Sequence, residues 1–137
     1  MSQGDETPAG DFLLFVYGTL MRDGPRARVL AGQRFLSEAR TAPGYALYDL
    51  GPYPGLVRRD GAGPVRGEVF AVAASLRPVL DRVEGAPHLY RLEEIQLDGA
   101  AGPVYAYFYQ GDPRNLPQVA GGRWDNRRAA PWDGGEL

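Results

Sequence analysis

The sequence predicts one small α+β domain in which a curled, mostly antiparallel sheet or barrel carries short helices at its side. Two patterns indicate this class. Short apolar runs of strand-forming residues recur with turn residues between them, whereas only two stretches have the features of a helix. The runs are too short, and the turns too frequent, for a doubly wound parallel sheet. At 137 residues the chain can bury a core without disulfides or a metal.

The first half of the domain is expected to contain four strands and one short helix. Strands are predicted at residues 13–16, 33–41, 45–50 and 56–59. A helix is predicted at residues 25–31, because Pro25 suits a first helical position and Gly32 suits a stop. Residues 51–55 contain two prolines and two glycines, so they are expected to form a shaped loop that is neither helix nor strand.

The second half is expected to contain three strands and a longer helix. Strands are predicted at residues 65–72, 90–97 and 103–110. The last two are joined by a turn-rich segment, which favours a hairpin. A helix of about nine residues is predicted from an apolar stripe at helical spacing, made by Leu76, Val79, Leu80 and Val83. Ser75 is expected to cap its N-terminus and Gly85 to end it.

The two ends of the chain differ in composition from the middle. Residues 1–11 are polar and small, so they are expected to form a disordered arm. Residues 12–110 would form the domain. In residues 111–137 Pro, Gly, Asn and Arg dominate, and we expect an extended C-terminal tail that is anchored at Trp124.

Composition excludes several classes of chemistry. The chain has no Cys, a single histidine (His88) and no Lys, so its 15 basic residues are all Arg. Thiol nucleophiles, lysine Schiff bases and Walker-type phosphate lysines are therefore excluded, and a metal centre is not expected. The formal net charge of -2, with charges scattered along the chain, argues against nucleic acid. No membrane-spanning run or signal peptide is present, so we expect a soluble cytoplasmic protein.

The first strand ends at the segment Tyr17-Gly18-Thr19-Leu20. A buried strand that ends at a glycine presents bare backbone N–H groups, because Gly18 has no Cβ to keep a ligand away and can adopt positive φ. This segment is therefore a candidate anion cradle. The alternative is an ordinary strand-to-loop turn, which is the more common use of an isolated glycine.

Among the seventeen carboxylates, Glu84 has the most informative position. It borders the apolar stripe at the C-terminus of the predicted helix, so partial burial is expected. Burial and the negative end of the helix dipole both disfavour the anion and raise the pKa of a carboxyl group. A general base that later acts as an acid needs such a pKa. The alternative is a solvated carboxylate at a fraying helix end, which is the more common arrangement.

Other polar side chains give weaker signals. His88 lies in a loop, where a lone histidine is more often a surface residue than a catalyst. No triad spacing supports Thr19 as a nucleophile. The tyrosines at 105, 107 and 109 share one strand face, which is more often a packing surface, although one hydroxyl could bind a ligand.

Five segments occur in an order that is more specific than any of them alone. They are residues 15–20, 51–56, 66–70, 80–85 and 107–109. In kind and in order they resemble the gamma-glutamylcyclotransferase-like family, and residues 122–124 resemble a weaker tail motif of that family. The likeness runs from about residue 12 to residue 110.

This resemblance implies a small α+β domain with a closed or nearly closed β-barrel of about six strands and two or three short helices. It also implies an enzyme without metal or cofactor that releases 5-oxoproline from a gamma-glutamyl amine or amino acid. By motif, Glu84 would be the catalytic acid/base. The substrate-binding residues would be Tyr17, Gly18, Thr19, Leu20, Tyr53, Tyr90 and Tyr109.

The sequence leaves two functions open. The family often has an arginine two residues after the tyrosine that follows the glutamate, whereas here Tyr90 is followed by Arg91 and then Leu92. A domain that binds a small molecule or a partner without catalysis is therefore the alternative. The leaving amine and the oligomeric state cannot be predicted.

Overall fold

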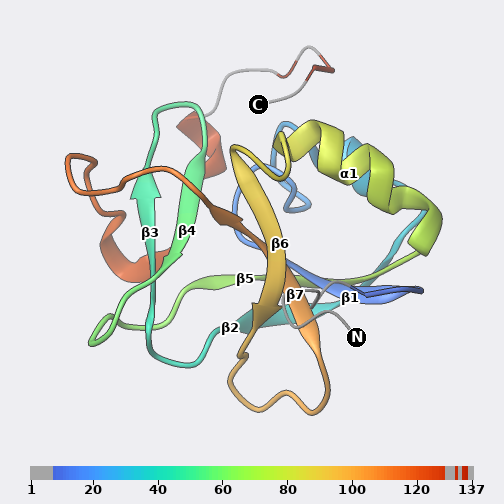
Figure 1. Ribbon diagram of the computed structural model, residues 1–137, viewed down its shortest axis with the longest axis horizontal. Coiled ribbons are helices and arrows are strands. Elements are labelled where there is room, and N and C mark those ends of the chain that lie inside the picture. The colour runs from blue at the N-terminus through green and yellow to red at the C-terminus, as the bar shows by residue number, and fades with distance from the viewer. Residues whose placement is uncertain (1–7, 129–131, 133, 136–137) are drawn as a thin grey trace.

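A five-stranded sheet forms the centre of the computed structural model, which describes residues 8–128, 132 and 134–135 (Figure 1). Its strand order is β2-β5-β1-β7-β6, and β3 and β4 form a separate two-stranded sheet. The strands are β1 (Phe12–Val16), β2 (Arg34–Arg40), β3 (Tyr45–Asp49), β4 (Pro54–Arg58), β5 (Arg66–Val72), β6 (Tyr90–Ile95) and β7 (Val104–Tyr109). The helix α1 spans Arg77–Glu84, and short 3-10 turns cover Ala27–Leu30, Ala74–Leu76, Ala120–Gly122 and Asn126–Arg128. The predicted α+β class is confirmed.

The strand β1 lies in the middle of the sheet. It pairs antiparallel with β5, where Leu14 faces Phe70, and parallel with β7, where Leu14 faces Tyr105. The predicted hairpin is confirmed, since β6 and β7 pair antiparallel from Tyr90–Tyr109 to Ile95–Val104. The sheet is thus mostly antiparallel with one parallel pair at its centre.

The predicted closed or nearly closed barrel is not confirmed, because the five-stranded sheet has β2 and β6 as its edges. These edges do converge where they end. Thr41 and Leu97 form an antiparallel bridge, the Ala42 N–H donates to the Gln96 carbonyl at 2.9 Å, and the Asp98 N–H donates to the Arg40 carbonyl at 3.0 Å. The sheet is therefore strongly curled but stays open along most of both edges.

Two local predictions about strands and caps were wrong. The strand β4 begins at Pro54, inside the predicted loop 51–55, since a strand accepts proline as its first residue. Ser75 does not cap α1 but lies within the 3-10 turn that precedes it, and no side chain caps the helix. The predicted end is confirmed, because Gly85 has a φ of 63° and follows the last helical residue.

The predicted helix at residues 25–31 is only a 3-10 turn, Ala27–Leu30. A segment this short gains few hydrogen bonds for the residues that it fixes, so tertiary contacts decide its form. Leu30 is its one buried residue and anchors the turn in the core.

The core has two parts that meet at β1. Leu14 and Val16 belong to one cluster, which includes Leu80 of α1, whereas Phe15 belongs to the other, which includes Leu47 and Leu56 of the β3–β4 hairpin. This alternation follows from the period of two in a strand. The C-terminal end of β1 therefore lies between the helix layer and the hairpin layer, where the two clusters separate (Figure 1).

The segment after β7 packs against the domain. The Val119 N–H donates to the Leu47 carbonyl at 2.8 Å, the Asp49 N–H donates to the Pro117 carbonyl at 2.8 Å, and Trp124 is buried. Residues 1–7 of the predicted N-terminal arm, and 129–131, 133 and 136–137 of the predicted tail, lie outside the described residues. Within the described part of the chain, no helix is long and apolar enough to span a membrane.

Candidate active site

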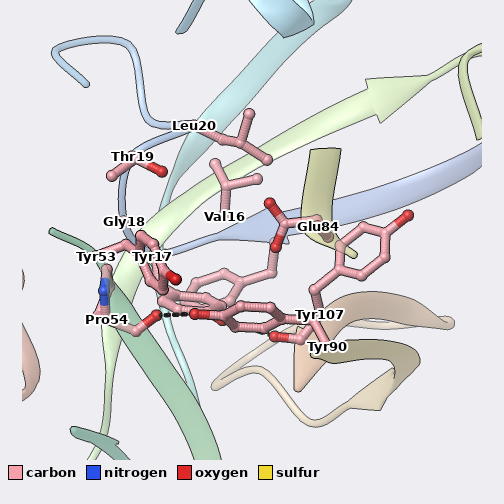
Figure 2. A pocket seen from close by; sticks show the side chains of 11 residues that line it. Val16, Tyr17, Gly18, Thr19, Leu20, Tyr53, Pro54, Glu84, Tyr90 and Tyr107 are labelled. Atoms are coloured by element: carbon pink, nitrogen blue, oxygen red, sulfur yellow. Dashed lines mark hydrogen bonds between the residues drawn. The ribbon is translucent and has the colours of Figure 1, made fainter. Parts of the chain in front are cut away.

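A cavity opens where β1 ends, between the helix layer and the hairpin layer (Figure 2). Its wall combines residues 15–20 with Tyr53, Pro54, Glu84, Tyr90 and Tyr107. These residues come from β1 and the loop after it, the start of β4, the last turn of α1, β6 and β7. Glu84 is the only charged side chain in this wall.

The cavity measures about 30 Å³, which is room for roughly two water molecules. A ligand larger than this extends beyond the cavity or displaces side chains around it. Tyr53 is only half-buried, whereas Tyr17, Thr19, Leu20, Glu84 and Tyr90 are buried. Tyr53 is thus the most exposed residue of the wall.

The loop after β1 approaches β4 closely because residue 18 is glycine. A Cβ atom at Gly18 would lie 2.6 Å from Cγ of Pro54, closer than two carbon atoms approach without strain. Positive φ, which a glycine also permits, is not used at this position. Gly18 is therefore needed for close packing at the wall of the cavity.

Glu84 is buried as the last residue of α1, with 6% of its surface exposed. Burial raises the pKa of its carboxyl group to about 7, with a smaller upward contribution from Asp81, while the guanidinium of Arg26 acts in the opposite direction. The direction agrees with the expectation from the sequence. A carboxyl group with this pKa is present in both protonation states near neutral pH.

Arg26 places a buried positive charge beside the cavity. It precedes the 3-10 turn Ala27–Leu30, is 6% exposed, and donates from Nη1 to Oγ1 of Thr19. Its guanidinium lies over the ring of Tyr53, 5.4 Å from the ring centroid. A buried arginine beside a buried carboxyl group keeps part of that group ionised.

Three buried tyrosines connect the walls of the cavity. The hydroxyl of Tyr17 donates to the Tyr107 carbonyl at 2.6 Å, that of Tyr90 to the Pro54 carbonyl at 2.6 Å, and that of Tyr107 to Oδ1 of Asp81 at 2.7 Å. Burial raises the pKa of all three hydroxyls. They therefore act as neutral hydrogen-bond donors that join the end of β1 to β7, β6 to β4, and β7 to α1.

The structure brings most of the predicted site residues together. Glu84, Tyr17, Gly18, Thr19, Leu20, Tyr53 and Tyr90 all line the cavity. Tyr109 does not: its ring packs edge-on against Tyr90, with 5.9 Å between centroids, behind the wall. His88 is exposed on the surface, and Arg91 is exposed too, next to Glu93 at 3.8 Å.

Sequence reasoning missed Pro54 and Arg26, and it named Tyr107 only as one of three tyrosines on a strand face, any one of which could bind a ligand. The Tyr105–Tyr109 alternation did indicate one strand face, but it could not show that Tyr107 alone reaches the cavity. Arg26 is one of 15 arginines, and no spacing distinguishes it. Among the described residues, no group of three or more Asp, Glu or His side chains is arranged to hold a metal ion.

Comparison with known proteins gives a family match over most of the chain. The model of the family described as "Gamma-glutamyl cyclotransferase, AIG2-like" matches residues 14–126. A Vibrio cholerae protein that carries gamma-glutamylcyclotransferase as a provisional name is 38% identical over 115 residues, which cover 84% of this chain and 96% of that protein. Human gamma-glutamylaminecyclotransferase is 39% identical over 87 residues, which cover 58% of this chain and 57% of the human protein.

Solved structures have the same fold. An AIG2-like protein from Mus musculus superimposes with a TM-score of 0.75 at 23% identity, over 90% of this chain and 97% of the mouse chain. An uncharacterized protein from Pyrococcus horikoshii superimposes with a TM-score of 0.70 at 28% identity, over 85% of this chain and 92% of the other.

Proposed function

This chain belongs to the gamma-glutamyl cyclotransferase, AIG2-like family, and on that premise we propose that it releases 5-oxoproline and a free amine from a gamma-glutamyl amine or amino acid. In this proposal Glu84 is the general base and then the general acid, and the loop from Tyr17 to Leu20 binds the substrate. The observation that carries the proposal is the single buried carboxyl group, with a pKa of about 7, in the wall of the same cavity as that loop.

The proposed reaction is an intramolecular ring closure. Glu84 accepts a proton from the substrate's α-ammonium group, and the neutral amine attacks the γ-carbonyl carbon of the same substrate. The attacking nitrogen loses a second proton as the C–N bond to the leaving amine breaks. Both protons pass to the leaving nitrogen, one of them through Glu84, so that the amine departs as an ammonium ion. No activated side-chain nucleophile is needed, because the substrate supplies its own amine. Holding the substrate chain folded supplies much of the acceleration, since the orientation entropy is lost on binding.

The raised pKa of Glu84 suits both proton transfers. A carboxyl group with a pKa of about 7 accepts a proton in one step and donates it in the next without a large free-energy cost in either direction. An exposed glutamate, with a pKa near 4.3, would be a weaker base and would be ionised at neutral pH.

The loop after β1 supplies groups for the negative charges of the substrate. Gly18, Thr19 and Leu20 line the cavity, and backbone N–H groups in such a turn can bind the α-carboxylate or the oxyanion that develops on the γ-carbonyl. The positive charge of Arg26 beside Thr19 favours an anion at this position.

The test is 5-oxoproline release from a panel of gamma-glutamyl amines and gamma-glutamyl dipeptides, with Glu84→Gln purified in parallel. Release by the wild type that falls by at least a hundredfold in Glu84→Gln would support the proposal. Tight binding of a panel member without any product would favour a non-catalytic binding domain. Full turnover by Glu84→Gln would contradict the role of Glu84.

A further inference from the structure

Asn126, in the segment after β7, contacts the loop that the proposed function assigns to substrate binding. We propose that Asn126 is a positioning residue, which fixes the Gly18–Thr19 peptide group so that the Thr19 N–H points into the cavity. This inference rests on the proposed function, because the role of that N–H is to donate to the oxyanion that develops on the γ-carbonyl.

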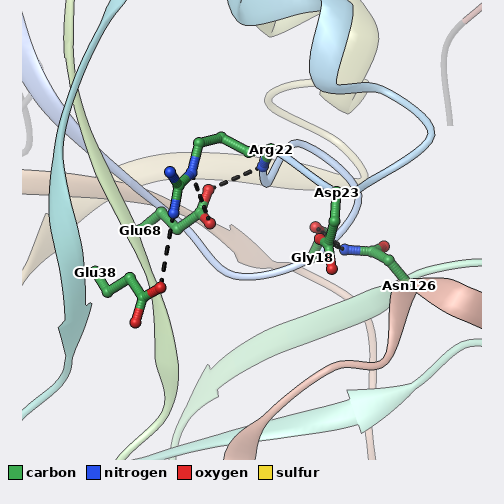
Figure 3. A network of polar contacts seen from close by, with 6 residues as sticks. All are labelled: Gly18, Arg22, Asp23, Glu38, Glu68 and Asn126. Atoms are coloured by element: carbon green, nitrogen blue, oxygen red, sulfur yellow. Dashed lines mark hydrogen bonds and ion pairs between the residues drawn. The ribbon is translucent and has the colours of Figure 1, made fainter.

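Asn126 reaches the loop from a distant part of the sequence. It begins the 3-10 turn Asn126–Arg128 and is 7% exposed. Its Nδ2 atom donates to the Gly18 carbonyl at 3.0 Å and to Oδ1 of Asp23 at 2.9 Å (Figure 3). Both amide hydrogens are therefore used, and Asp23 holds the amide in the orientation in which it meets Gly18.

The position of Asn126 determines which way the peptide group points. Gly18 and Thr19 line the cavity of the candidate active site, whereas Asn126 and Asp23 line a second cavity and take no part in the first. The Gly18 carbonyl thus accepts from a side chain that lies outside the lining of the first cavity. In a trans peptide the carbonyl and the following N–H point in opposite directions, and this bond is trans. The Thr19 N–H therefore points away from Asn126, and Thr19 itself lines the first cavity.

The hydrogen bonds of the loop agree with this orientation. The Gly18 carbonyl also accepts from the Met21 N–H at 3.1 Å, and the Thr19 carbonyl accepts from the Arg26 N–H at 2.9 Å. In the part of the chain that the structure describes, no acceptor is recorded for the N–H groups of Thr19 and Leu20. Carbonyls that are engaged elsewhere and N–H groups without an internal acceptor are the arrangement that an anion site requires.

A second set of contacts holds the Arg22 end of the loop, and Asn126 takes no part in it. Glu68 of β5 accepts from the Arg22 backbone N–H at 2.9 Å and from Nε of Arg22 at 3.2 Å, and Arg22 also lies 3.6 Å from Glu38 (Figure 3). Loss of Asn126 would thus release the Gly18 end of the loop while β5 still holds the Arg22 end. The variant should fold, and its defect should be local.

The expected defect is larger in kcat than in KM. An oxyanion donor stabilises charge that develops only in the transition state, and removing one such donor costs about a hundredfold to a thousandfold in kcat. Asn126 orients the donor without being the donor. We therefore expect Asn126→Ala and Asn126→Asp to lower kcat by about tenfold to a hundredfold, with a KM change of less than about threefold.

The experiment compares these two variants with Asp125→Asn, which makes a similar exchange one residue away. The Asp125 side chain is 47% exposed and pairs with Arg127 on the surface, so this control should keep its activity. Two quantities are measured: the ¹⁵N order parameter of the Thr19 N–H in the ligand-free protein, and kcat and KM for 5-oxoproline release. We expect a Thr19 order parameter of about 0.85 in wild type and control, and below about 0.6 in both Asn126 variants.

A lowered order parameter together with a lowered kcat in the Asn126 variants alone would support the proposal. An unchanged order parameter, unchanged kcat in the Asn126 variants, or an equal loss of kcat in Asp125→Asn would each overturn it. Absence of turnover in the wild type with every substrate would contradict the proposed function instead. In that event the order parameter, which needs no substrate, would still decide whether Asn126 fixes the peptide group.

Discussion

Replacing Glu84 by Gln should stabilise the protein at neutral and alkaline pH while it abolishes activity. Glutamine has nearly the shape of the protonated carboxyl group but cannot ionise. The pKa of Glu84 is raised from its ordinary value of 4.5 to about 7 in the folded protein. At 1.36 kcal/mol per unit, ionising this group in the folded protein costs roughly 3 kcal/mol more than in the unfolded chain.

The pH interval follows from the two pKa values. Below pH 4.5 Glu84 is protonated in both states, and its full contribution to stability is present. As the pH rises toward 7 the unfolded chain loses the proton first, so the folded state is progressively disfavoured, and above pH 7 the loss is complete. The free energy of unfolding of Glu84→Gln relative to wild type should therefore be close to zero at pH 4 and about 3 kcal/mol higher at pH 8.

Urea denaturation at both pH values measures this difference. The control is Glu38→Gln, whose side chain is 82% exposed, and which should change stability by less than about 0.5 kcal/mol at either pH. If Glu84→Gln were instead destabilised at pH 8, Glu84 would be ionised and stabilised by Arg26 in the folded protein. The argument from burial would then be refuted.

Three further predictions follow from the contacts of the site. Arg26→Met removes the positive charge that lowers the pKa of Glu84. The acidic limb of the profile of kcat/KM against pH should therefore move to higher pH in this variant. An unmoved limb would show that the two groups are not coupled. Asp81→Asn removes a negative charge that raises the pKa of Glu84, so the acidic limb should move to lower pH in this variant. A shift to higher pH would contradict the assignment of this limb to Glu84. Gly18→Ala should destabilise the protein by about 1–3 kcal/mol in urea denaturation, because its Cβ would lie 2.6 Å from Pro54. Adding Pro54→Ala should restore part of that loss, and no restoration would place the strain elsewhere.

Local patterns in the sequence predicted the parts of the site that depend on short-range rules. The apolar run before Gly18 predicted β1, and the stripe ending at Val83 predicted that Glu84 borders the core. Both inferences use only the periodicity of one strand or one helix. The five-segment resemblance then related these two places to one family.

Features that depend on long-range packing were not predictable in the same way. The parallel pairing of β1 with β7, and the open edges of the sheet, are decided by contacts between segments far apart in the chain. The roles of Arg26 and Asn126 also depend on long-range packing. Each has an ordinary surface residue type, and only the packing of its segment against the loop at Gly18 and Thr19 buries it.

The most direct test of the central claim is quantitative product analysis with wild type and Glu84→Gln on one panel of gamma-glutamyl amines and dipeptides. The account predicts that the wild type forms 5-oxoproline and the free amine in equal amounts, with kcat/KM rising through about pH 7, and that folded Glu84→Gln forms neither. Equal product formation by both proteins would contradict it, because the proton transfers would then not pass through Glu84.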